Sequence, residues 1–291
     1  MKTVEQLLHA GHTQLLEVTT DVDQAWLEAE LLLGQVLGQD RVWLAIHRDQ
    51  TLTDSQHEAF QQLLARRTTH EPMAYILGEA SFYGRSFHVT KDTLIPRFET
   101  ERIIDEIRST IMTDTRKTAF WDVGTGSGIL AITLKSLYPQ MTVVGSDISA
   151  AALEIARENA KALPLEHPIF LEGSLLEEKL LTHLAQLPCE QFVIVANLPY
   201  LPESDKQILD RQVTAFEPSL ALFVSDEGLS LNKKLIEQVA QFAKKDGRPV
   251  TLLLEFDPPQ ATTLETFAKA FFAETRIIKD HCDRERFLVL R

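Results

Sequence analysis

The sequence is poor in cysteine, in long apolar runs and in positive charge, and each shortage excludes a class of protein. Its 291 residues include only two cysteines, Cys189 and Cys282, without the paired spacing of a disulfide framework or a zinc site, which suits a reducing compartment. No apolar run approaches the roughly 18 residues of a membrane span, and the first residues lack the apolar core of an export signal. We therefore expect a cytoplasmic protein without a membrane segment or a bound metal.

The excess of acidic residues indicates which kinds of binding partner to expect. The chain has 42 acidic residues against 29 Lys and Arg, a net charge of −13. Such an excess disfavours a broad surface for phosphate groups, although it is compatible with a local basic patch. We expect a protein partner or a small molecule, and no direct contact with nucleic acid.

The first seventy residues have the pattern of amphipathic helices in a chain of more than one domain. A hydrophobic content of 44% is that of a globular protein, and 291 residues exceed the usual size of one domain. Thr3 with Gln6 and Thr53 with Gln56 have the spacing of capping boxes, and residues 21–38 predict a further helix. We expect a small helical bundle, which is either a folding appendage or a partner-recognition module.

From Thr118 onward strands alternate with helices, after a segment at 75–96 whose glycines and aromatic residues predict a hairpin. Such alternation is typical of an α/β fold with a mostly parallel sheet that helices cover on both faces. The expected strands are 119–123, 142–147, 168–172, 191–197, 250–256, 273–279 and 285–290, and the expected helices lie near 127–137, 149–162, 229–245 and 258–272.

A glycine-rich turn follows the first of these strands. After Asp122 the turn contains Gly124, Thr125, Gly126, Ser127 and Gly128. Glycines let the backbone approach a ligand closely, and the helix that follows presents free N–H groups. The next strand ends in Asp147, where a carboxylate can bind ribose hydroxyls. A nucleoside cofactor is implied, and the glycine spacing differs from the dinucleotide fingerprint, which favours S-adenosylmethionine over NAD.

The strand at 191–197 leads directly into Leu198, Pro199 and Tyr200, and this segment can hold a planar NH2 group. An amide is a poor nucleophile because its nitrogen lone pair is delocalised, as the roughly 18–20 kcal/mol barrier to peptide C–N rotation shows. The Asn197 side-chain oxygen and the Leu198 carbonyl offer two acceptors for two N–H donors, and Tyr200 offers a flat face for packing. Pro199 favours an extended backbone at Leu198. The alternative is an ordinary strand followed by a proline turn.

Further segments carry a family resemblance over nearly the whole chain. The most specific are 71–78, 87–89 and Leu94-Ile95-Pro96-Arg97-Phe98-Glu99-Thr100-Glu101. They resemble the region that joins the two domains of the PrmC/HemK family, the glutamine methyltransferases of peptide-chain release factors. The resemblance continues through the glycine turn, Asp147, Asn197 to Tyr200, 216–218, 226–229, Glu255 and Arg286.

The resemblance implies a class I (Rossmann-like) methyltransferase with a seven-stranded sheet over residues 118–291. It also implies a hairpin linker and connecting helix over 76–117, and a helical domain over 1–75 that recognises the release factor. The methyl group would pass from S-adenosyl-L-methionine to the side-chain amide nitrogen of the glutamine in a Gly-Gly-Gln motif, leaving S-adenosyl-L-homocysteine. No metal is needed for this transfer.

Site residues carry over from the family by position. Those implied for the cofactor are Asp122, Gly124, Thr125, Gly126, Ser127, Gly128, Asp147, Ser174, Leu175 and Asn197. Those implied for catalysis and for binding the substrate amide are Asn197, Leu198, Pro199 and Tyr200. Arg97 and Glu101 are expected either to line the mouth of the site, where Arg97 would contact substrate, or to form a structural salt bridge.

The chain departs from the family pattern at several positions. Leu198 stands in place of the first proline of Asn-Pro-Pro-Tyr, where any residue supplies the same backbone carbonyl. Ser174 and Leu175 stand where the family has Asp and often an aromatic residue near the adenine, and Ser174 can still form a hydrogen bond. The remaining departures are Phe98 in place of a proline, and Asp257 and Asp283 in place of common glycines.

Three other functions stay open at this point. A glutamine methyltransferase of a ribosomal protein would use the same chemistry. A nucleic-acid adenine amino-methyltransferase shares the Asn-x-Pro-Tyr element but is expected to show a basic face. A binding protein that keeps the fold without turnover is disfavoured by the intact Asp147 and Asn197. The family-like linker from Glu71 to Glu101 favours the release factor as substrate.

Overall fold

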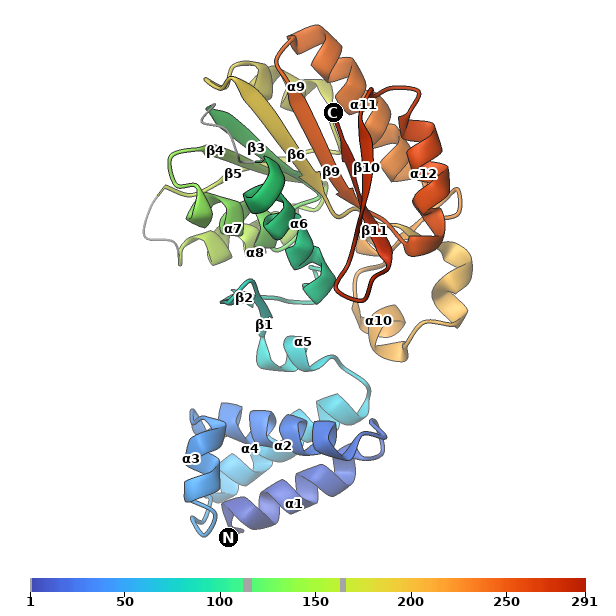
Figure 1. The fold of residues 1–291 in the computed structure, drawn as a ribbon. Helices are drawn as coiled ribbons and strands as arrows, with labels where there is room; N and C mark the ends of the chain where they lie inside the picture. Colours follow the sequence, from blue (N-terminus) through green and yellow to red (C-terminus); the bar gives the residue numbers. More distant parts are fainter. Residues whose placement is uncertain (1, 112–116, 163–165) are drawn as a thin grey trace. The chain divides into compact units, whose positions relative to one another are not determined.

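The computed structural model describes residues 2–111, 117–162 and 166–291, and the chain divides into two compact units (Figure 1). One unit comprises Met1–Glu79 with Asp210–Phe216, and the other comprises Ala80–Leu209 with Glu217–Arg291. Within the described ranges no helix is both long enough and apolar enough to cross a bilayer.

The first unit is a bundle of helices whose ends are set by local sequence. Its helices are α1 (Val4–Leu15), α2 (Val22–Leu37), α3 (Arg41–Ile46), α4 (Asp54–Thr68), α5 (Met73–Leu77) and α10 (Arg211–Phe216). The pairs Thr3–Gln6 and Thr53–Gln56 form the predicted capping boxes of α1 and α4, which satisfy N–H groups that a first turn leaves free. α2 ends at Gly38, whose φ of +63° is the left-handed conformation that glycine adopts without strain.

An apolar core joins α1, α2 and α4. Leu33 and Phe60 are completely buried in it. A buried ion pair links α2 to α4, because Arg67 Nε lies 2.8 Å from Glu28 Oε2. The helices α3 and α5 were not predicted, since segments of 6 and 5 residues are too short to show a helical period.

The predicted hairpin is present as β1 (Glu79–Phe82) and β2 (Arg85–His88). Tyr83 and Gly84 connect the strands and have φ values of +49° and +72°. Positive φ at both central residues is the requirement of the type I′ turn, whose twist matches that of the strands.

The second unit is built on a seven-stranded sheet of order β10-β11-β9-β6-β3-β4-β5. β11 is antiparallel to β9 and β10, and the other neighbouring strands are parallel. The strands are β3 (Thr118–Val123), β4 (Thr142–Asp147), β5 (Ile169–Glu172), β6 (Gln191–Ala196), β9 (Val250–Glu255), β10 (Thr275–Lys279) and β11 (Glu285–Leu290). The prediction of these seven strands and of the α/β class is confirmed.

Helices cover both faces of this sheet, α7 and α8 on one face and α11 and α12 on the other (Figure 1). Alternate strand residues enter separate apolar clusters: Trp121 and Ile194 pack with residues of α11 and α12, and Phe120 and Val193 pack with residues of α6 and α7. Burial on both faces explains why β3 and β6 are continuous apolar runs. The helices are α6 (Glu101–Glu106), α7 (Ile129–Leu137), α8 (Ala150–Ala160), α9 (Glu178–Ala185), α11 (Ser230–Asp246) and α12 (Ala261–Ala268).

Some short elements differ from the prediction. The helix expected over 258–272 is α12, preceded by a 3-10 turn at Pro258–Gln260, because proline has no N–H for an interior helical bond. The helix α9 and the paired two-residue strands β7 (Leu201–Pro202) and β8 (Phe223–Val224) were not predicted. Two residues carry no periodicity, so β7 and β8 depend on tertiary pairing.

The order of strands reverses at β3. The chain places β4 and then β5 on one side of β3, and it places β6 on the other side. At such a switch point the chain leaves neighbouring strands toward opposite faces, and a crevice opens beyond their carboxyl ends. The glycine turn after β3 and Asn197 after β6 both lie at this crevice.

Candidate functional site

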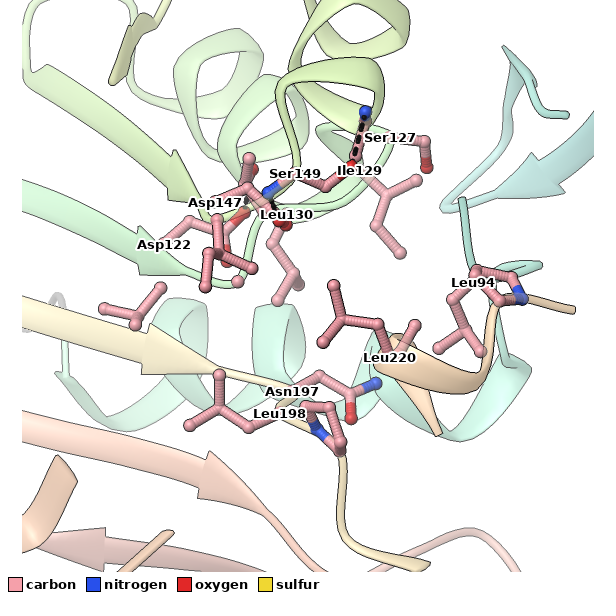
Figure 2. A pocket seen from close by; sticks show the side chains of 18 of the residues that line it. Leu94, Asp122, Ser127, Ile129, Leu130, Asp147, Ser149, Asn197, Leu198 and Leu220 are labelled. Atoms are coloured by element: carbon pink, nitrogen blue, oxygen red, sulfur yellow. Dashed lines mark hydrogen bonds between the residues drawn. The ribbon is translucent and has the colours of Figure 1, made fainter. Parts of the chain in front are cut away.

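A cavity of about 220 Å³ lies beyond the carboxyl ends of β3, β4, β5 and β6 (Figure 2). Its remaining wall comes from the segments 92–100 and 218–221 and from residues of the helices α7, α8 and α11. The predicted site residues that line it are Arg97, Asp122, Gly124, Thr125, Ser127, Asp147, Ser174, Leu175, Asn197, Leu198 and Pro199. Gly126, Gly128 and Tyr200 belong to the described chain but are not part of this wall.

The glycine turn is tied to the end of the neighbouring strand β4. The N–H groups of Gly124 and Thr125 donate to the Ser146 carbonyl at 2.8 and 2.9 Å. Gly124 has a φ of +75°, and a Cβ there would stand 2.8 Å from Leu198 Cδ2. The turn after β3 therefore contacts the segment after β6, and a side chain at position 124 would require the Leu198 side chain to move. At Gly126, by contrast, a Cβ would meet no described atom within 4 Å.

Asp122 is buried at the base of the turn with one carboxylate oxygen unsatisfied. Its Oδ2 accepts from Thr125 Oγ1 at 2.6 Å and from the Ala131 N–H at 3.1 Å. Its Oδ1 has no partner among the described residues. Burial raises the pKa of Asp122 to about 7, against these hydrogen bonds, which lower it. An unpaired acceptor of this kind fits the donor of a ligand, and a cationic amine above all.

Asp147 holds the neighbouring turns together and still has acceptor capacity. Its Oδ2 accepts from the Gly126 N–H at 2.9 Å and its Oδ1 accepts from the Ser149 N–H at 2.8 Å. Burial raises the pKa of Asp147, and the same backbone donors lower it. Each carboxylate oxygen has a second lone pair, so hydroxyl groups in the cavity can still donate to Asp147.

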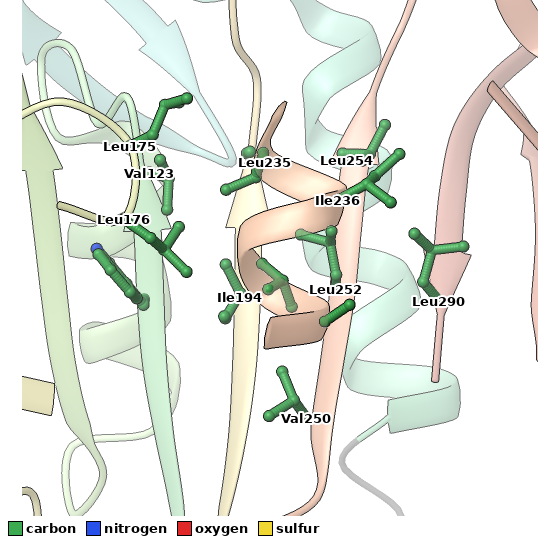
Figure 3. Close-up of a cluster of buried hydrophobic side chains, with 14 of the residues drawn as sticks. Val123, Leu175, Leu176, Ile194, Leu235, Ile236, Val250, Leu252, Leu254 and Leu290 are labelled. Carbon is green, nitrogen blue, oxygen red and sulfur yellow. The ribbon is translucent and has the colours of Figure 1, made fainter. Parts of the chain in front are cut away.

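Ser174 and Leu175 follow β5 and line the cavity, as does Ile148, which is 55% exposed. Leu175 has a φ of +46°, a conformation that disfavours a side chain, and is nevertheless 7% exposed. It belongs to the same apolar cluster as Val123 and Leu176 (Figure 3). The core therefore fixes Leu175 at the cavity wall, where an apolar surface suits a flat base.

The Asn197 side chain extends from the end of β6 into the cavity (Figure 2). Its Nδ2 donates to Thr100 Oγ1 at 3.0 Å. Within the described ranges its Oδ1 and the Leu198 carbonyl accept no hydrogen bond. Leu198 is 5% exposed and contacts the glycine turn as noted above. Two acceptors at one strand end are thus unoccupied, which is the arrangement that a planar NH2 group requires.

Tyr200 lies outside the cavity wall and is held from two sides. Its hydroxyl donates to Glu255 Oε1 at 3.1 Å, and its carbonyl accepts from Gln260 Nε2 at 2.8 Å. Gly228 packs so closely that a Cβ there would stand 2.0 Å from the Tyr200 oxygen. Burial, and then the charge of Glu255, raises the pKa of Tyr200, so the phenol stays protonated and remains a donor.

Arg97 both lines the cavity and forms a salt bridge. Its Nη2 lies 2.6 Å from Glu217 Oε1. The other oxygen of Glu217 accepts from the Ile95 N–H at 3.1 Å, so this carboxylate ties two segments of the wall together. Glu101 accepts from the Tyr83 N–H at 2.7 Å and is not part of the wall formed by the described residues.

The structure shows the backbone conformation or the contacts of three residues that depart from the family pattern. Asp283 has a φ of +63°, which explains why glycine is common there. Phe98 is 64% exposed with its ring centroid 5.1 Å from that of His281. The Asp257 N–H donates to Gln260 Oε1 at 3.1 Å.

Sequence reasoning gave no role to several residues at the site. Thr100, Glu217 and Glu255 were noted only as parts of family-like segments, and Ile148 and Leu220 were not noted at all. The signal for Ile148 was its place directly after a strand-end carboxylate. Leu220 lies in a short 3-10 helix, Ser219–Ala221, that only the tertiary structure brings to the wall (Figure 2).

The geometry fits a cofactor that combines a cationic amine with a ribose. Asp122 offers the unpaired acceptor, Asp147 offers acceptors for hydroxyl groups, and Leu175 with Ile148 offers an apolar surface. No group of three or more potential metal ligands gathers among the described residues.

Comparison with known proteins agrees with this geometry. The family model of the PrmC N-terminal domain matches residues 6–78. A protein of Chlorobaculum tepidum named release factor glutamine methyltransferase is 34% identical over 272 residues, covering 92% of this chain and 90% of that protein. The chain belongs to the release factor glutamine methyltransferase family. A family member from Koribacter versatilis is 38% identical over 228 residues, covering 78% of each chain. The resemblance to the PrmC/HemK family is therefore confirmed.

Two further matches concern the methyltransferase unit. The family model of the ribosomal protein L11 methyltransferase (PrmA) matches residues 101–219. Among solved structures, the hMettl16 catalytic domain in complex with the MAT2A 3′UTR hairpin 1 has a TM-score of 0.55 and 12% identity, covering 84% of this chain and 83% of that chain. At this identity the likeness establishes the methyltransferase fold and nothing further.

Proposed function

We propose that this protein transfers a methyl group from S-adenosyl-L-methionine to the side-chain amide nitrogen of the glutamine in the Gly-Gly-Gln motif of peptide-chain release factors. The observation that carries the proposal is the pair of unoccupied acceptors at Asn197 and Leu198, two residues that line the same cavity as the turn after β3. Membership of the release factor glutamine methyltransferase family supports the choice of substrate.

The cofactor would lie along the ends of β3, β4 and β5. Asp122 Oδ1 would accept from its amino group, Asp147 would accept from its ribose hydroxyls, and Leu175 would pack on its base. The cofactor supplies a methyl group on a sulfonium, which is an activated leaving group. The protein then needs to bind, orient and exclude water, and it needs no metal.

Asn197 and Leu198 would act on the glutamine amide. Its two N–H groups would donate to Asn197 Oδ1 and to the Leu198 carbonyl, which fixes the nitrogen in line with the methyl carbon. As the nitrogen attacks, its lone pair leaves the amide resonance and its N–H groups become more acidic, and the methylated nitrogen then loses one of these protons to solvent. Both hydrogen bonds are therefore stronger in the transition state than in the ground state, which is the condition for catalysis.

Selectivity for a whole release factor requires contacts beyond one small side chain. We assign them to the helical unit over residues 1–75. Its helix α3 presents Val42 and Ile46, which are 66% and 73% exposed and lie one helical turn apart. The double variant Val42→Ser with Ile46→Ser should slow methylation of intact release factor more than methylation of a short Gly-Gly-Gln peptide. Equal effects on both substrates would contradict this assignment.

One assay tests the proposed function directly. Labelled S-adenosylmethionine is offered in parallel to release factor, to ribosomal protein and to RNA, and mass spectrometry locates the product. We expect one added methyl on the glutamine of the Gly-Gly-Gln motif. Methyl on a ribosomal protein would instead favour the activity named by the PrmA match, and methyl on adenine would favour a nucleic-acid enzyme.

A further inference from the structure

A chain of hydrogen bonds connects Asn197 to the buried carboxylate of Glu255. We propose that Thr100 and Glu255 are positioning residues, which hold the Asn197 amide so that its oxygen faces the reacting nitrogen. The inference rests on the proposed function only for the reaction that Asn197 serves.

The chain of bonds joins three distant parts of the sequence. Asn197 Nδ2 donates to Thr100 Oγ1 at 3.0 Å, and Thr100 Oγ1 donates to Glu255 Oε2 at 2.8 Å. Tyr200 donates to the other oxygen of Glu255 at 3.1 Å. Thr100 and Glu255 are 0% and 1% exposed, so water does not compete for these bonds.

The ionised carboxylate sets the direction of every bond in the chain. A carboxylate only accepts, so Thr100 must give its single hydroxyl hydrogen to Glu255. The Thr100 oxygen is then left with lone pairs alone, and it can bond only to the donor end of the Asn197 amide. With the amide turned over, two acceptor oxygens would face each other at hydrogen-bonding distance. The Asn197 Oδ1 is therefore directed away from Thr100, where it can accept from a substrate NH2 group.

The orientation of the Asn197 amide depends on whether Glu255 is protonated, and the surroundings of Glu255 set the pH at which this happens. Burial raises the pKa of Glu255 to about 7, the bonds from Thr100 and Tyr200 and the charge of Arg286 lower it, and the charge of Glu99 raises it. A protonated Glu255 can itself donate to Thr100, and the Thr100 hydrogen then becomes free to bond to Asn197 Oδ1. Above that pKa the amide has one allowed orientation, and below it both are allowed.

Substitutions at Thr100 separate positioning from packing. Thr100→Val keeps the shape and removes the hydroxyl, whereas Thr100→Ser keeps the hydroxyl. Thr133→Val is the matched control, because Thr133 is buried in α7 and its hydroxyl has no hydrogen-bond partner among the described residues. We expect Thr100→Val to lower kcat by roughly 10–100-fold, as loss of an orienting outer-shell group does at metal sites, with the affinity for S-adenosylmethionine unchanged. Thr100→Ser should recover most of the lost rate.

A second measurement needs no methyl transfer. In protein labelled with 15N-asparagine, the side-chain signal of Asn197 is identified by its loss in Asn197→Ala. In the wild type this signal should show slowed hydrogen exchange at pH 8 and should shift as the pH falls through about 7. In Thr100→Val both the protection and the titration should disappear.

The outcomes distinguish the inference from the proposed function. A wild-type protein that does not methylate release factor refutes the proposed function, and the Asn197 signal still tests the inference. A folded Thr100→Val variant with wild-type kcat, an equal loss in Thr133→Val, or an Asn197 signal that is the same in wild type and Thr100→Val would each overturn the positioning role.

Discussion

Replacing Asp122 by Asn should change how the stability of the protein depends on pH. Asp122 is 1% exposed, and burial raises the pKa of its carboxyl from 3.8 to about 7. The folded state then binds this proton more tightly than the unfolded chain does. A raised pKa contributes stability that is fully present below the unfolded value and is lost as the pH rises through the folded value. The contribution of Asp122 therefore declines between about pH 4 and pH 7.

The size of the effect follows from the shift. One pKa unit corresponds to about 1.36 kcal/mol, so a rise of roughly three units corresponds to a loss on the order of 4 kcal/mol across that window. Asn at position 122 does not titrate, so the variant does not lose this stability as the pH rises. Its stability relative to wild type should therefore improve as the pH rises, whatever constant offset the new side chain introduces. Titrating groups that do not interact with Asp122, such as Glu255, are present in both proteins and cancel in the comparison.

Urea unfolding of wild type and Asp122→Asn at intervals from pH 4.5 to pH 8 measures this difference. We expect the difference in unfolding free energy to change by at least about 1–2 kcal/mol in favour of the variant as the pH rises. This value is below the roughly 4 kcal/mol that the full pKa shift of Asp122 allows. Saturating S-adenosylmethionine should shrink the change, since an ammonium group beside Oδ1 lowers the pKa again. A difference that stays constant over the whole pH range would refute the assignment of an unsatisfied, proton-binding carboxyl at Asp122.

Three further predictions concern the cavity itself. Asp147→Ala should weaken binding of S-adenosylmethionine by about 1–3 kcal/mol, because ribose hydroxyls lose their acceptor, and unchanged affinity by calorimetry would contradict this role. Asn197→Ala should leave that affinity largely intact and lower the methyl-transfer rate by about two orders of magnitude, so a variant with normal turnover would exclude the amide-holding mechanism. Gly124→Ala and Gly38→Ala both force a side chain into a left-handed conformation, at about 1–2 kcal/mol each, with φ values of +75° and +63°. Only Gly124→Ala also meets Leu198, so it alone should slow methyl transfer in steady-state assays, and equal rates in the two variants would argue against that contact.

The sequence by itself determined the elements whose causes are local. The capping boxes of α1 and α4 need residues only three positions apart, and both are present as predicted. The seven strands of the sheet were predictable because burial on both faces requires continuous apolar runs, such as that of β6 (Gln191–Ala196). The order of strands and helices then placed the glycine turn and Asn197 at carboxyl strand ends, where such sheets bind ligands.

Only the tertiary structure decided which side chains act together. The bonds from Thr100 to Asn197 and to Glu255 span 97 and 155 positions of sequence, so no local pattern contains them. Tyr200 was predicted to offer a flat face to the substrate, and only the tertiary structure shows that its hydroxyl donates to Glu255. A buried carboxylate needs hydrogen-bond donors, and Tyr200 and Thr100 satisfy that need. The residue types showed which hydrogen bonds each side chain can form, and the tertiary packing determined the partner with which it forms them.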